Sequence, residues 1–183
     1  MIQLKPGDHF FYRQEDYLDD LEFVCLDIRN GIGGGKSCYS ITANPLPTQM
    51  PFNNRDDNKW AESTLNLYLN TQFTQRLGIV NMSSQNNFAI IMSPGCAGYV
   101  SVLSLEEYIK YKDIVPRYPH SWWLCSEDEF DTHLALGVCS HVNADTYPVK
   151  TNLSVFPVCA FRYDDKINFT KEDDKIIIQY TNS

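Results

Sequence analysis

The sequence predicts an α+β fold, and two observations lead to this class. Aromatic residues make up 13% of the 183 residues, which favours strands because aromatic side chains suit the pleated surface of a sheet. The predicted order is strands, two helices and a β-rich C-terminal half, without the βαβ alternation of a doubly wound parallel sheet. We expect one domain over residues 1–183, since a chain this long buries roughly 70% of its unfolded surface without crosslinks.

Three strands are expected near the N-terminus, at residues 8–12, 21–28 and 37–42. They are rich in the aromatic and β-branched residues that strands prefer. The glycine-rich run at 30–36 is similar to a phosphate-binding loop, but that loop must lead into a helix, and a strand-like segment follows here. The run therefore favours a hairpin turn.

Two helices are expected in the centre of the chain. The first begins near residue 62 and ends at Gly78, and its apolar residues recur at spacings of three and four: Leu65, Tyr68, Leu69, Phe73 and Leu77. Ser104 and Glu107 have the spacing of a capping box, so a second helix is predicted from there to about residue 112. Between the helices we expect a short strand at 88–92 and a loop at 93–98.

Alternating apolar and polar residues predict that the C-terminal half is rich in strands. The expected strands are residues 122–125, 134–141, 147–149, 155–161, 167–169 and 176–180. We expect the last two to form a β-hairpin extension over residues 163–183, with a charged turn between them.

Charge and composition argue against nucleic-acid binding and membrane insertion. The net charge is −8, and no cluster of Lys and Arg is present to release counterions from a phosphate backbone. No run of about 18 apolar residues occurs, and the first residues lack a basic stretch followed by an apolar one. We expect no nucleic-acid partner, no membrane insertion, and synthesis in the cytoplasm without a signal peptide.

The cysteines are interpreted as mostly buried free thiols. Five of the six lie inside apolar or alternating runs: Cys25, Cys38, Cys125, Cys139 and Cys159. Only Cys96 lies in an expected loop, and a disulfide framework is the alternative interpretation. The chain has no Cys-x-x-Cys or His-x-x-x-His spacing, which argues against a zinc site.

No residue is predicted to be catalytic. The four histidines are scattered, and a thiol and base pair of His120 with Cys125 is disfavoured because a buried strand cysteine is inert. We expect no cofactor unless calcium binds, since calcium takes six to eight oxygen ligands from flexible loops. The weak calcium candidates are Glu127, Asp128, Asp131 and Asp145, and a solvated acidic loop is the simpler interpretation.

Trp122 and Trp123 are the strongest candidates for a binding role. Adjacent residues on a strand point to opposite faces, so one ring is expected in the core and the other at a ligand, an adjoining domain or another subunit. Aromatic rings with polar tips give contact area at small entropic cost. We predict a protein- or carbohydrate-binding site formed by Tyr99, Tyr118, His120, Trp122 and Trp123.

Several segments, in their order along the chain, resemble a bacterial and phage family of unknown function. They are Phe-Val-Cys-Leu-Asp at 23–27 before a glycine turn, Pro-Phe-Asn at 51–53, Trp60 with Ser63, Ser104 with Glu107, and Trp-Trp-Leu at 122–124. The family's signature is WWLRSP with a closing GVRPA, and the family is remotely similar to C-type-lectin-like domains, which include formylglycine-generating enzymes. The resemblance covers about residues 7–162 and implies two helices packed on antiparallel sheets.

The chain departs from this signature at Cys125, where relatives have arginine, and at 156–161, where the closing glycine and arginine are missing. The cysteine pair of the formylglycine-generating relatives is not recognisable. The resemblance implies a non-catalytic binding or structural module, most plausibly a phage particle component that contacts a host surface or a neighbouring virion subunit. The alternatives are a phage-encoded inhibitor of a host protein and an enzyme of unidentified activity.

Overall fold

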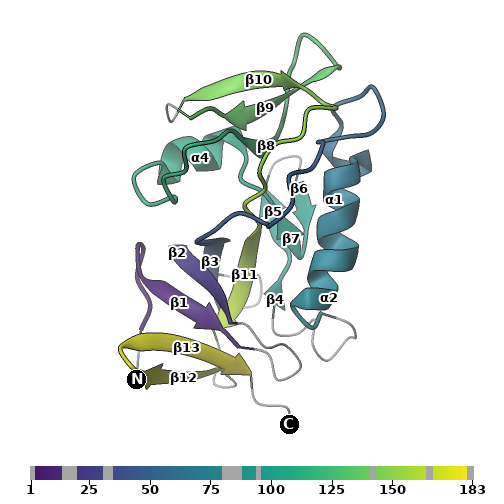
Figure 1. The fold of residues 1–183 in the computed structure, drawn as a ribbon. Helices are drawn as coiled ribbons and strands as arrows, with labels where there is room; N and C mark the ends of the chain where they lie inside the picture. The colour runs from purple at the N-terminus through teal and green to yellow at the C-terminus, as the bar shows by residue number, and fades with distance from the viewer. Residues whose placement is uncertain are drawn as a thin grey trace.

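The fold is a mixed α+β arrangement in which sheets predominate (Figure 1). The computed structural model describes residues 3–13, 20–30, 35–79, 88–93, 96–140, 143–163 and 167–180. Within these residues the strands form an eight-stranded, a three-stranded and a two-stranded sheet. No helix of the described part is long and apolar enough to cross a membrane.

The eight-stranded sheet has the order β12-β13-β1-β2-β3-β11-β4, and β7 also pairs with β11. Its strands are β1 (His9–Tyr12), β2 (Leu21–Asn30), β3 (Lys36–Thr42), β4 (Phe88–Ala89), β7 (Val100–Ser101), β11 (Val158–Tyr163), β12 (Ile167–Glu172) and β13 (Lys175–Tyr180). Strands β2 and β3 pair antiparallel, as a hairpin requires, although residues 31–34 of the glycine run lie outside the described residues. A strand follows that run, so the helix needed by a phosphate-binding loop is absent there.

The expected C-terminal hairpin is confirmed, and it extends the large sheet. Strands β12 and β13 pair antiparallel around Asp173 and Asp174, whose φ angles of 46° and 66° place both in the left-handed region of a tight turn. Strand β13 pairs parallel with β1, which corrects the expectation of purely antiparallel sheets. Periodicity does not reveal this pairing, because it joins the two ends of the chain.

The three-stranded sheet has the order β10-β9-β8, with β8 (Trp122–Glu127), β9 (Leu134–Val138) and β10 (Ala144–Pro148). A small hairpin is formed by β5 (Ile91–Ser93) and β6 (Cys96–Gly98). Two expectations are therefore wrong. The strand expected at 88–92 is interrupted at Ile90, which is 54% exposed, and the loop expected at 93–98 contains a strand.

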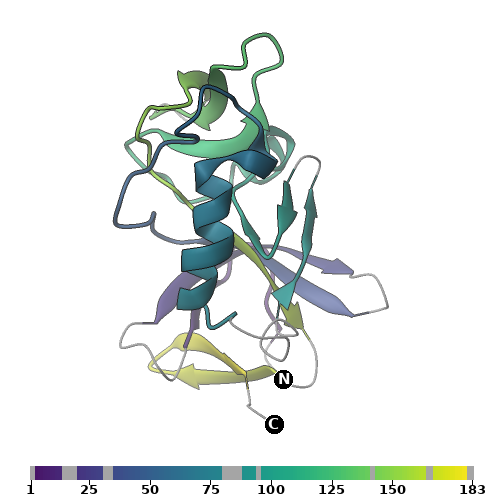
Figure 2. The same ribbon diagram turned by 90° about the vertical axis from the view of Figure 1, so that its right-hand side faces the viewer.

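Both predicted helices are present. The first comprises η1 (Trp60–Glu62), α1 (Thr64–Tyr68), the π-helical segment η2 (Leu69–Phe73) and α2 (Thr74–Arg76), and Gly78 follows with a φ of 69°. Figure 2 shows this helical segment running from the three-stranded sheet towards the C-terminal hairpin. The second helix is α4 (Leu105–Tyr111), and its capping box between Ser104 and Glu107 is formed as predicted.

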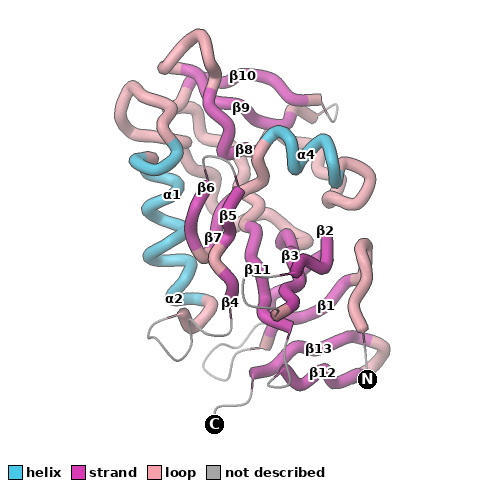
Figure 3. Tube along the Cα trace, turned by 180° about the vertical axis from the view of Figure 1, so that it is seen from behind, coloured by secondary structure: helices cyan, strands magenta, loops and turns pink. Residues whose placement is uncertain are grey.

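Two hydrophobic clusters, which we call the first core and the second core, hold these layers together. The first core contains Phe10, Phe23, Trp60, Phe73, Trp123 and Phe161 among others, and the second contains Tyr39, Tyr108, Trp122, Leu124, Phe156 and Val158 among others. Figure 3 shows β8 beside α4 at one end of the molecule, with the β12–β13 hairpin at the other. Strand β8 contributes side chains to both cores.

Candidate binding surfaces

Trp123 is a core residue. Its side chain is fully buried, and its indole N–H donates a hydrogen bond of 2.8 Å to the Met50 carbonyl. Its ring makes edge contacts with Phe52 and Tyr147, at centroid distances of 5.5 and 6.1 Å. Since both the apolar surface and the polar atom of the indole are satisfied internally, Trp123 has no ring face left for a ligand.

Trp122 is buried as well, on the opposite face of β8. It is 3% exposed, and its ring packs against Tyr108 of α4 and against Phe156, at centroid distances of 5.8 and 5.2 Å. A binding role for Trp122 stays a prediction, but the expectation that one of the two rings lies outside the core is wrong. The physical reason is that α4 and the segment before β11 cover the second face of the strand.

The other predicted aromatic residues are divided between the two cores, and only Tyr118 lies beside Trp122, on Phe156 and at the same small opening. Tyr99 is half-buried against the first core, and its backbone N–H donates to the Asn70 side chain. Tyr118 packs on Phe156 of the second core, with His120 beside it at a centroid distance of 5.4 Å. Only Tyr118 and His120 of the predicted set lie together near the surface, and His120 is exposed.

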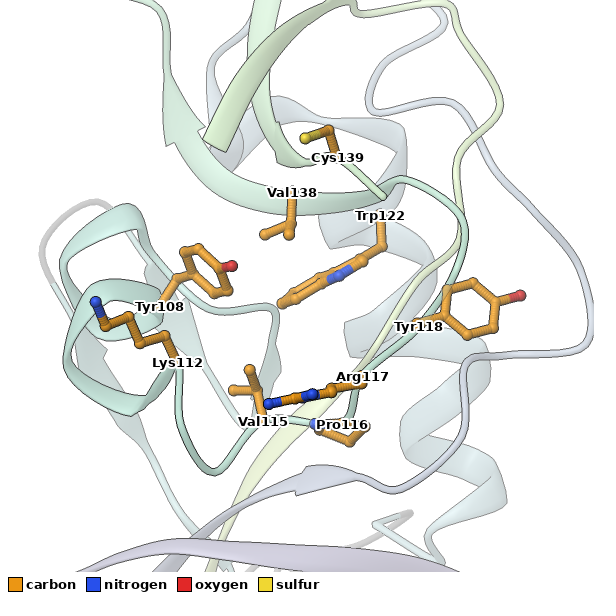
Figure 4. Close-up of a pocket in the computed structure, with 9 residues that line it drawn as sticks. All are labelled: Tyr108, Lys112, Val115, Pro116, Arg117, Tyr118, Trp122, Val138 and Cys139. Carbon is orange, nitrogen blue, oxygen red and sulfur yellow. The ribbon is translucent and has the colours of Figure 1, made fainter. Parts of the chain in front are cut away.

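A shallow hollow opens beside these residues, and we call it the basic hollow. It has room for about one water molecule. Figure 4 shows the Trp122 ring reaching its centre, with Tyr108 and Lys112 on one side. The hollow is lined by Tyr108, Lys112, Val115, Pro116, Arg117, Tyr118, Trp122, Val138 and Cys139.

The lining of the basic hollow carries positive charge on an otherwise acidic chain. Lys112 and Arg117 are both exposed, and the lining contains no carboxylate, whereas the whole chain has a net charge of −8. Neither residue forms an ion pair with the described part of the chain. Both are free to meet an anionic group. Sequence reasoning missed this pair because no motif marks two cations that a turn brings together.

A second surface feature lies between β8 and β9, and we call residues 127–131 the acidic loop. Four of its side chains are carboxylates, and Phe130 stands among them with 96% of its surface exposed. It is the most exposed of the large apolar residues that the structure describes. From the sequence, the carboxylates of this segment predict only a calcium site or a solvated loop, and no motif marks the aromatic ring among them.

The acidic loop is held in place by specific hydrogen bonds. The side-chain amide of Asn58, which is only 3% exposed, donates to the carbonyls of Asp128 and Leu134 at 2.9 and 2.8 Å. The Asp128 carboxylate accepts from the backbone N–H groups of Phe130 and Asp131 at 2.9 and 2.7 Å. The backbone that carries the exposed ring is therefore ordered before any partner arrives.

The weak calcium candidates are used in local contacts instead of converging on one point. Glu127 accepts from the backbone N–H of Trp60, while Asp145 lies on β10 and accepts from the N–H of Thr146. Asp131 accepts from the backbone N–H and the ring of His133, and these hydrogen bonds lower its pKa. The described residues contain no group of three or more His, Cys, Asp or Glu that could hold a metal. Calcium binding stays a prediction.

The cysteine interpretation is correct in part. Cys25, Cys38, Cys139 and Cys159 are free, but Cys125 is disulfide-bonded, which corrects the expectation that it is a free thiol. A pair of Cys125 thiol and His120 base is thereby ruled out. Burial raises the pKa of Cys159, which makes that thiol unreactive.

A polar cluster fixes α4, and with it one wall of the basic hollow. Arg29 of β2 donates to Glu107 at 3.0 Å, and Asp27 accepts from Lys110 and Tyr111 at 3.0 and 2.8 Å. Burial alone raises the pKa of Asp27, but the hydrogen bonds from Lys110 and Tyr111 outweigh it, so the pKa is lowered. Asp27 is thus ionised at neutral pH and ties the helix to the large sheet.

Comparison of the chain with models of protein families, with curated proteins and with solved structures gives no match in any of the three. The acidic loop and the basic hollow are the two surface features that bear on function.

Proposed function

We propose that this chain is a non-catalytic binding module that contacts a protein partner through its acidic loop. The observation that carries this proposal is Phe130, which is 96% exposed on a loop that Asn58 and Asp128 hold in place. An exposed apolar ring of this size costs solvation free energy, and the charged residues around it do not cover it. A partner that buries the ring removes that cost.

The loop has the properties of an interface anchor. Aromatic side chains dominate the energetics of many interfaces, and a surrounding ring of polar groups excludes water from them. Because the backbone is already ordered, binding immobilises little more than the Phe130 side chain, which keeps the entropic cost low. The four carboxylates favour a partner that has an apolar pocket surrounded by Lys or Arg side chains.

The setting that we propose is a phage particle, in which the chain contacts a host surface or a neighbouring virion subunit. The resemblance of residues 7–162 to a bacterial and phage family remotely similar to C-type-lectin-like domains supports this setting, and we propose that the fold is C-type-lectin-like. A phage-encoded inhibitor of a host protein is the alternative that the negative charge favours, because electrostatic steering accelerates association with a basic target.

The test uses the full chain, isolated envelopes of the host bacterium and purified phage particles. Phe130→Ala removes the ring, and Ile109→Ala removes another exposed apolar side chain, 59% exposed on α4, as a matched control. We expect wild type and Ile109→Ala to co-sediment with one of the two targets, and Phe130→Ala to bind at least about tenfold more weakly. Equal binding of all three proteins contradicts the proposal. Capture of one soluble host protein instead supports the inhibitor.

A further inference from the structure

We propose that the acidic loop of one copy docks in the basic hollow of a second copy of this chain. This inference rests on the proposed function, because it uses the same loop. It identifies the partner as a second copy of the chain. The two features complement each other in chemistry: an apolar ring among carboxylates on one side, and an apolar floor between cations on the other.

The complementarity can be followed residue by residue. Phe130 meets the floor of the hollow, which Trp122 and Val115 form. The carboxylates beside the ring then lie within reach of Lys112 and Arg117, which have no carboxylate partner among the described residues. Arginine is suited to such a contact because its planar guanidinium pairs with a carboxylate through two parallel hydrogen bonds.

The loop cannot reach the hollow of its own chain. The hollow lies at the end of the β8–β9 hairpin where Trp122 pairs with Val138, and the loop joins the two strands at the other end, beyond the pairing of Glu127 with Ala135. The six residues of β8 span about 20 Å at the usual rise along a strand. A contact between the two features must therefore join different molecules.

Such a contact is heterologous, since different surfaces of the two copies meet. Repetition of a heterologous contact produces a closed ring or an open filament. The contact is small and therefore weak between free molecules, because stable interfaces bury about 1,200 Å² or more. At physiological salt the like net charges of two copies are screened beyond about 8 Å, whereas the paired groups at the contact lie closer than that.

The small size of the hollow sets a condition on docking. It holds about one water molecule as it stands, so the phenyl ring covers its mouth while the exposed side chains of Lys112 and Arg117 move around the ring. Changes of interface side-chain rotamer are common when proteins associate. No movement of β8 or α4 is needed.

The experiment mixes two variants of the full chain, and sedimentation velocity measures their assembly over a range of concentrations. The loop variant carries Glu129→Lys and Phe130→Ala. The hollow variant carries Lys112→Glu and Arg117→Glu. A charge-matched control carries Lys5→Glu and Lys36→Glu, two exposed positions away from the hollow.

We expect wild type and control to form species larger than a monomer as concentration rises, and each of the other two variants to remain monomeric when alone. An equimolar mixture of the loop and hollow variants should form dimers and nothing larger, because one intact loop and one intact hollow remain to be paired. Wild type that stays monomeric up to about 1 mM, a concentration at which even weak contacts are populated, contradicts the inference. A hollow variant that assembles like wild type contradicts it as well, as does a mixture that forms no dimer.

The outcomes separate this inference from the proposed function. If Phe130→Ala loses binding to envelopes or particles but the purified chain never self-associates, the acidic loop is a contact surface for another partner, and only the second-copy inference fails. If the substitution changes neither envelope binding nor self-association, both fail.

Discussion

The tryptophan pair and Phe130 lie near opposite ends of strand β8, and they differ in burial. Trp122 and Trp123 are both buried, each in a different hydrophobic core, whereas Phe130 is 96% exposed. The most prominent aromatic pair in the sequence is thus structural. The ring that a partner can contact is that of Phe130, and the other residues of the acidic loop all carry carboxylates. In this chain the flanking residues, and not the size of the ring, indicate which aromatic side chain is exposed.

The largest expected effect is on the buried side of this comparison. Trp123→Ala should lower the free energy of unfolding by about 3–5 kcal/mol, because it leaves a cavity and removes the hydrogen bond from the indole to the Met50 carbonyl. Urea unfolding measures the change. A loss below about 1 kcal/mol contradicts a core role for this ring.

Gly137, which pairs with Trp123, tests how tightly the Trp123 face of the β8–β9 hairpin is packed. A Cβ at Gly137 lies 2.8 Å from the Trp122 carbonyl oxygen and 3.1 Å from the Tyr147 ring, so Gly137→Ala should cost about 1–3 kcal/mol. Gly35→Ala is the control, since a Cβ there meets nothing within 4 Å. Equal melting temperatures of the two variants contradict the packing described for this strand.

The order of the acidic loop depends on Asn58. Asn58→Ala should cost about 1–2 kcal/mol, because the Asp128 and Leu134 carbonyls lose their donor. Amide hydrogen exchange should accelerate at residues 128–131, where the loop loses its support. The exposed Asn54, whose side chain makes no such bonds to the loop, provides the control as Asn54→Ala. Unchanged exchange in Asn58→Ala shows that the loop is ordered by other means.

The smallest effect concerns pH. The folded pKa of Asp27 is lowered, so its contribution to stability is fully present above the unfolded value of about 3.9 and is lost as pH falls through the folded pKa. Asp27→Asn should therefore weaken the fall in stability with acid, measured by urea unfolding at pH 5 and at lower pH. Identical acid profiles for Asp27→Asn and wild type contradict the assigned role.

Much of the local structure could be predicted, because its causes lie close together in the sequence. The capping box of Ser104 and Glu107 and the glycine that ends the first helix depend on residues within one or two turns. The strands β1, β2, β3 and β8 follow from short alternating or apolar runs.

The candidate site could not be predicted, because its causes are non-local. Burial of Trp122 depends on α4 and Phe156 covering the strand, and the basic hollow depends on a turn that brings Lys112 and Arg117 to the same opening. The state of Cys125 likewise depends on three-dimensional proximity, which residue spacing does not reveal. Only Tyr118 and His120 of the predicted binding residues lie together near the surface.

The most direct test of the central claim measures stability and binding on the same two variants, Trp122→Phe and Phe130→Ala. We expect Trp122→Phe to lower the melting temperature but to bind envelopes or particles as wild type does. We expect Phe130→Ala to melt like wild type, with a change in stability within about 0.5 kcal/mol, and to lose binding. If binding is lost in Trp122→Phe and kept in Phe130→Ala, Phe130 is not the contact residue.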